Sequence, residues 1–60
     1  MTKIDRAEIE RVIDDLEEKI RHAKQLEKKY EEERAWGMKG MCMQSWRSYQ
    51  YCVDRLKELL

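Results

Sequence analysis

The stretch Trp36-Gly37-Met38-Lys39-Gly40 decides the fold, because it holds both glycines of this 60-residue, proline-free chain. Glycine inside a helix costs about 1 kcal/mol relative to alanine, so two glycines close together favour a break in the helix. A connection of this length suits antiparallel neighbours in a helical hairpin. The alternative is a single rod that continues through both glycines. We therefore expect one helix on each side of this stretch.

The N-terminal side predicts a long helix over residues 3–35. Thr2 or Asp5 is suited to cap its start, each with an acidic residue three positions later, as in a capping box. Apolar residues recur at three- and four-residue steps, which places them on one side of a helix. They are Ile9, Val12, Ile13, Leu16, Ile20, Ala23, Leu26 and Tyr30.

The C-terminal side predicts a shorter helix over residues 41–60. Alternating three- and four-residue steps, typical of a helix-packing seam, connect Cys42, Ser45, Tyr49, Cys52, Leu56 and Leu59. Val53 and Leu60 widen this seam. The two cysteines are ten residues apart on one helix face, which matches no zinc or redox motif. We expect them to be reduced and to fill small positions in the core, and the alternative is a contact across a symmetric interface.

The unequal helix lengths indicate self-association. At 1.5 Å per residue, roughly 20 Å of the first helix would lack a partner within the chain. Ile4, Ile9, Val12 and Ile13 would then be uncovered. A single domain over residues 1–60 is also too small for a thick core. We expect an all-α hairpin that assembles into a helical homo-oligomer.

One segment has a composition that helix formation does not explain. No Asp or Glu lies between Arg34 and Val53, although the chain as a whole has no net charge. Lys39, Met43, Trp46 and Gln50 form a second helical stripe there. Aromatic and basic side chains together suit a planar anionic ligand, a protein interface, or packing against another subunit. The candidate ligand-binding residues in this aromatic-basic window are Arg34, Trp36, Lys39, Trp46, Arg47 and Tyr51.

Other classes of function have little support in the sequence. His22 is the sole histidine and lacks a nucleophile and an orienting acid, so no catalytic residues are assigned. The acidic clusters lack a Glu-x-x-His pair, and no phosphate-binding glycine loop is present, so we expect no metal or cofactor. Balanced charge argues against DNA binding. The absence of a long apolar run argues against a signal peptide or membrane span, and we expect a cytoplasmic protein.

The end of the chain, Ser48-Tyr-Gln-Tyr-Cys-Val-Asp-Arg-Leu-Lys-Glu-Leu-Leu60, resembles the last helix of small bacteriophage proteins. Short helical phage proteins include anti-CBASS sponges, which sequester cyclic oligonucleotide signals in helical oligomers. The resemblance implies a non-catalytic oligomer in the host cell that sequesters a nucleotide-type immune signal in the aromatic-basic window. It transfers no individual binding residue. The alternative is a small inhibitor or adaptor that docks a host protein through its Trp, Met and Tyr surface.

Overall fold

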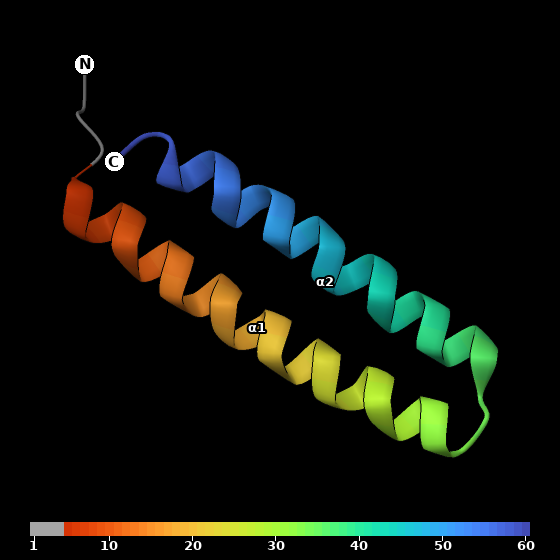
Figure 1. Cartoon of the computed structure of the whole chain (residues 1–60). Coiled ribbons are helices and arrows are strands. Elements are labelled where there is room, and N and C mark those ends of the chain that lie inside the picture. The colour runs from red at the N-terminus through yellow and green to blue at the C-terminus, as the bar shows by residue number, and fades with distance from the viewer. Residues whose placement is uncertain (1–4) are drawn as a thin grey trace.

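The computed structural model describes residues 5–60 and consists of two helices, α1 (Arg6–Glu32) and α2 (Trp36–Lys57). They run antiparallel and side by side, joined by a short turn (Figure 1). The expected all-α hairpin is confirmed. The expected bounds, 3–35 and 41–60, are wrong at the turn, because α2 begins five residues earlier than the sequence pattern indicated. Neither helix is long and apolar enough to cross a membrane within the described residues.

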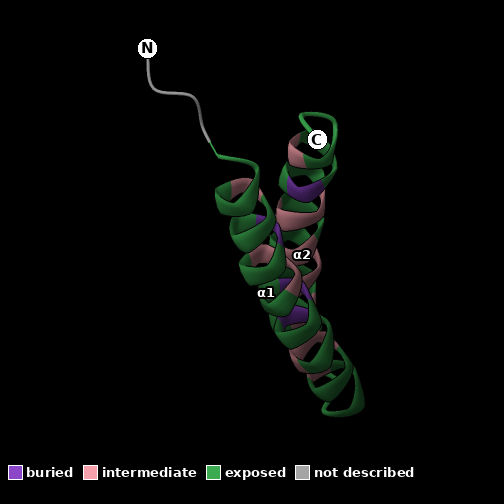
Figure 2. Ribbon diagram, turned by 90° about the vertical axis from the view of Figure 1, so that its left-hand side faces the viewer, coloured by how far each residue is buried: buried purple, intermediate pink, exposed green. Residues whose placement is uncertain are grey.

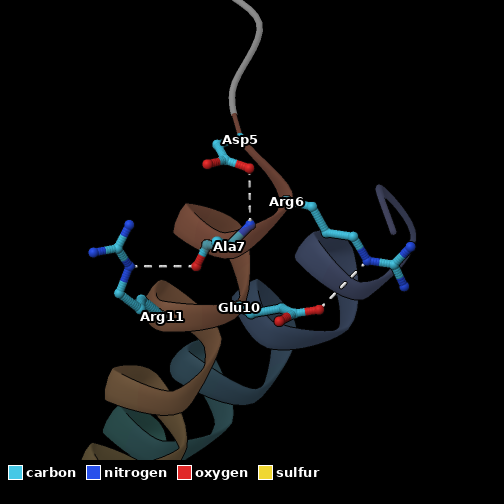
Figure 3. A network of polar contacts seen from close by, with 5 residues as sticks. All are labelled: Asp5, Arg6, Ala7, Glu10 and Arg11. Carbon is cyan, nitrogen blue, oxygen red and sulfur yellow. Dashed lines mark hydrogen bonds and ion pairs between the residues drawn. The ribbon is translucent and has the colours of Figure 1, made fainter.

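The start of α1 is capped by Asp5, one of the two residues expected to do so. The Asp5 side chain accepts a hydrogen bond of 3.3 Å from the backbone N–H of Ala7 (Figure 3). This bond satisfies one of the N–H groups that lack a partner at a helix start, and Glu8 in the first turn complements the helix dipole. Thr2, the other candidate cap, lies outside the described residues.

The chain reverses at residues 33–35 rather than at the glycines. Arg34 adopts a positive φ of 57°. Its N–H donates to the Glu31 carbonyl at 3.1 Å, and the Ala35 N–H donates to the Tyr30 carbonyl at 2.8 Å. This pair of bonds is the Schellman arrangement that closes many helix ends, with arginine in the left-handed position that glycine usually occupies.

Gly37 and Gly40 lie inside the first turns of α2, which corrects the expectation that they interrupt the helix. Neither has a positive φ, so neither uses the conformational freedom of glycine. The earlier start of α2 places Lys39 opposite α1, where its ammonium group is 3.1 Å from a Glu31 carboxylate oxygen. The Schellman bonds and the Lys39–Glu31 ion pair stabilise a turn at residues 33–35 that local sequence propensity did not predict.

The core is a narrow strip between the helices (Figure 2). Four hydrophobic side chains are buried among residues 5–60: Ile13, Ile20, Ala23 and Val53. Val53 has no exposed surface. The partly buried side chains that pack against this cluster are Ile9, Leu16, Trp46, Tyr49 and Leu56.

The expected overhang of α1 is much smaller than the sequence suggested. The helices have 27 and 22 residues, so their lengths differ by only about 8 Å. Ile13 is buried within the hairpin and Ile9 packs against its core, so neither is left uncovered. Val12 remains about half exposed. Ile4 lies outside the described residues.

Only part of the expected seam of α2 is covered by α1. Tyr49 and Leu56 pack against the core, and Val53, which was expected to widen the seam, is buried at its centre. Ser45, Cys52 and Leu59 are exposed. Cys42 is only half-buried, so the prediction that both cysteines fill the core is wrong. The stripe of Lys39, Met43, Trp46 and Gln50 is half-buried and lies nearer to α1. Relative to the predicted seam, α2 is therefore rotated about its axis.

The position of Gly37 gives a direct test of the turn. A methyl group added there would meet nothing within 4 Å, so Gly37→Ala removes the helix penalty of glycine without a clash. We expect the free energy of unfolding to rise by about 0.5–1 kcal/mol, measured by urea denaturation at fixed protein concentration. A loss of stability would contradict a helical conformation at Gly37 and would indicate that the chain turns at the glycines.

Arg34 gives the complementary test, because glycine avoids the steric cost of the left-handed conformation. We expect Arg34→Gly to stabilise the protein by up to about 1 kcal/mol, since part of the gain is offset by the greater freedom of glycine in the unfolded chain. Arg34→Ala, which keeps Cβ, is the matched control and should leave stability nearly unchanged in the same denaturation experiment.

Candidate functional site

The hairpin divides the aromatic-basic window into an inner and an outer part. Trp46 and Lys39 are half-buried and face α1, whereas Trp36, Arg47 and Tyr51 are exposed. Arg34 is exposed in the turn. The six predicted residues therefore do not converge on one enclosed pocket.

Trp46 is the member that the hairpin itself uses. Its ring packs against the core, and its indole Nε1–H donates a 2.8 Å hydrogen bond to a Glu27 carboxylate oxygen on α1. The Lys24 ammonium nitrogen lies 4.6 Å from the ring centre and the Arg47 guanidinium carbon 5.8 Å from it. Both cations are within cation–π range. This tryptophan thus joins the two helices.

The turn end of the window is partly neutralised by α1. Lys39 pairs with Glu31 at 3.1 Å, and its ammonium nitrogen lies 5.5 Å from the centre of the Trp36 ring. Trp36 itself is 60% exposed. Acidic residues of α1 therefore contact a segment of α2 that contains no acidic residue. The sequence pattern did not reveal this contact.

The outer part of the window contains a shallow hollow with no acidic residue in its lining. The hollow measures about 730 Å³ and is lined by Gly40, Met43, Gln44, Arg47, Ser48, Tyr51 and Cys52. Arg47 forms no ion pair within residues 5–60. Tyr51 is 65% exposed. A guanidinium, an aromatic ring, a hydroxyl and an amide thus share one surface that is open to solvent.

A second depression lies between the helices, and sequence reasoning did not identify it. This groove measures about 490 Å³ and is lined by Asp15, Glu18, Lys19, His22, Ala23, Leu26, Cys42, Ser45 and Tyr49. The available signal was the heptad spacing of Cys42, Ser45 and Tyr49, which was assigned to the hairpin core instead. His22 and Cys42 line the same groove, but no hydrogen bond joins them within the described residues.

Metal-binding geometry is also absent from the described part of the chain. Among residues 5–60, no three His, Cys, Asp or Glu side chains are grouped closely enough to hold a metal ion. The groups that line these surfaces offer stacking, hydrogen bonds and cationic side chains, with Lys19 in the groove and Arg47 in the hollow.

Comparison with known proteins found no relative of this chain. No model of a protein family, no curated protein and no solved structure matches the chain.

The two tryptophans should respond very differently to truncation. Trp46→Ala removes a ring packed on the core together with its bond to Glu27, and we expect a loss of about 2–4 kcal/mol in the free energy of unfolding. Trp36→Ala, at an exposed ring, should cost less than about 0.5 kcal/mol. Urea denaturation of both variants at one protein concentration makes the comparison. Equal losses would contradict the inner placement of Trp46.

Proposed function

We propose that this chain is a non-catalytic, self-associating binding protein that sequesters a planar anionic ligand of the nucleotide type on the outer face of α2. The observation that carries the proposal is Arg47, a guanidinium without an ion-pair partner in residues 5–60, in a hollow with no acidic lining residue. Guanidinium groups bind phosphate oxygens in bidentate geometry, so such an arginine suits a phosphate.

Tyr51 supplies the second element of recognition. It lies one helical turn from Arg47, lines the same hollow and is largely exposed, so its ring is available to a base. Stacking of a base on an aromatic ring is typically worth about 1–3 kcal/mol. Gln44 and Ser48 add hydrogen-bonding groups to the hollow. We assign Trp46 to the contact between the helices rather than to the ligand.

The spacing along α2 extends this surface towards the turn. Trp36, Gly40, Arg47 and Tyr51 follow each other at helical steps that keep them on one side of the helix. Trp36 is thus one turn beyond Gly40, with Lys39 close to its ring. A ligand with two bases and more than one phosphate could span both ends. The likeness to small phage proteins favours a cyclic nucleotide immune signal, encountered in the host cytoplasm.

A protein partner is the second candidate, and the exposed apolar surface favours it. Trp36, Met41 and Tyr51 are each 60–65% exposed on one helix. Tryptophan, tyrosine, methionine and arginine are enriched at protein interfaces. In this alternative the chain is a small inhibitor or adaptor, and the side of α2 that carries Trp36 and Tyr51 docks onto the partner, with Met41 at its margin.

The ligand proposal predicts a matched pair of arginine variants. We expect Arg47→Ala to weaken nucleotide affinity roughly tenfold and to flatten its salt dependence, because a phosphate contact is lost. Arg55→Ala is the control, since Arg55 lies outside the hollow and pairs with Glu58 at 3.3 Å. Isothermal titration calorimetry against a panel of cyclic and linear nucleotides provides the measurement.

Tyr51→Ala separates the two candidates. For a nucleotide, loss of stacking should reduce affinity between about fivefold and a hundredfold with the fold unchanged. No heat with any nucleotide would end the ligand proposal. A host protein retained on the immobilised chain and released by both Tyr51→Ala and Trp36→Ala would instead support the adaptor.

A further inference from the structure

The two long edges of the hairpin differ in chemistry. On one edge, polar contacts join the helices: Glu31 with Lys39 at 3.1 Å, Glu27 with Trp46 at 2.8 Å and Glu17 with Lys57 at 4.0 Å. We call this the ion-pair edge. The groove of about 490 Å³ lies on the other, which we call the groove edge. No ion pair connects the helices across the groove edge within residues 5–60.

Both helices carry a heptad seam that contributes residues to the groove: Lys19, Ala23 and Leu26 from α1, and Cys42, Ser45 and Tyr49 from α2. On α2 the steps of three and four connect Met38, Cys42, Ser45, Tyr49, Cys52, Leu56 and Leu59, none of which is fully buried. On α1 the same steps connect Val12, Leu16, Lys19, Ala23, Leu26 and Tyr30, of which only Ala23 is buried. Heptad seams of this kind insert between the side chains of a facing helix. Two of them side by side form the surface onto which another pair of helices packs.

The chain is elongated and exposes more surface than a globular protein of its mass. Its accessible surface is 5155 Å², against about 4200 Å² expected for a globular monomer of 7.4 kDa. A typical stable interface buries roughly 800 Å² of each partner, which is a modest fraction of this surface. The radius of gyration is 14.3 Å, whereas a globular chain of this length has about 10 Å.

The charges at the rim of the groove identify the partner as a second copy. Asp15, Glu18, Lys19 and His22 line the rim in the middle of α1, with both signs represented. A two-fold axis crossing α1 between residues 18 and 19 places Glu18 opposite Lys19 of the second copy, and Asp15 opposite its His22. The same operation brings Val12 close to Leu26 of the second copy. A symmetric interface must complement itself, and this rim does.

We propose that two hairpins pack groove edge to groove edge as a symmetric antiparallel four-helix bundle, with the two-fold axis near Glu18 and Lys19. The proposal specifies the self-association that forms part of the proposed function. Leu26 and the other α1 residues of the groove then face α1 of the second copy. The hollow with Arg47 and Tyr51 stays on the outside of each α2, so the dimer would carry two copies of it.

Val12→Lys and Tyr51→Lys form a matched pair for testing the dimer. Val12 is 48% exposed on the groove edge, so the hairpin itself tolerates a lysine there, and Tyr51 is 65% exposed on the outer face. In sedimentation velocity at micromolar concentration, we expect a wild-type dimer of twice 7.4 kDa. Val12→Lys should raise the dimer dissociation constant at least tenfold, and Tyr51→Lys should leave it unchanged. Circular dichroism checks that both variants remain helical.

A charge swap tests the position of the axis. Glu18→Lys places like charges opposite each other at two symmetric positions, and we expect dimer affinity to fall about tenfold. The double variant Glu18→Lys/Lys19→Glu restores opposite charges and should recover affinity. A folded wild-type monomer, a dimer indifferent to Val12→Lys, or no recovery in the double variant would each overturn this arrangement. A monomer that still binds nucleotide would overturn the dimer alone, whereas a dimer that binds none would overturn the ligand proposal alone.

Discussion

The packing of Val53 between the isoleucines of α1 is the contact on which the rest of this structure depends. Val53 has no exposed surface, and it forms one cluster with Ile13 and Ile20. With so few buried side chains, the hairpin has little other apolar contact to determine how α2 is rotated. Burying a β-branched side chain fully removes more apolar surface from water than burying the smaller Cys52 beside it. The rotation that favours Val53 therefore also determines where every other side chain of α2 lies.

That rotation has consequences for charge. It turns Trp46 towards Glu27 and brings Lys39 and Lys57 close to carboxylates of α1. Each such ion pair contributes little by itself, since exposed pairs are typically worth less than about 1 kcal/mol. Together they give one edge of the hairpin a polar seam, and the acidic excess of α1 offsets the acid-free segment of α2. Arg47 lies beyond this seam, which is why it remains without an ionic partner in the described chain.

The same rotation gives α2 two separate surfaces, one at the groove and one on the outer face. Cys42, Ser45 and Tyr49 of the α2 seam line the groove, whereas Arg47, Ser48 and Tyr51 line the hollow on the outer face. In the arrangement that we propose, the first surface holds a second copy and the second holds a ligand. An assembly of this kind would double the number of ligand sites without placing them in the dimer interface.

The sequence by itself determined the helical class, favoured an antiparallel hairpin over a single rod, limited the N-terminal cap to Thr2 or Asp5, and defined the residues of the aromatic-basic window. These follow from local periodicity, capping chemistry and composition, which act over a few residues. Only the tertiary structure decided the turn, the core and the split of the window. The turn depends on the Schellman hydrogen bonds donated by Arg34 and Ala35, and on a positive φ at Arg34, which arginine rarely adopts. The position of Trp46 depends on Glu27, nineteen residues away, and on the volume of Val53. Contacts between distant residues select one rotation among several that the same periodicity permits, because a helix with two apolar stripes does not specify which stripe faces its neighbour.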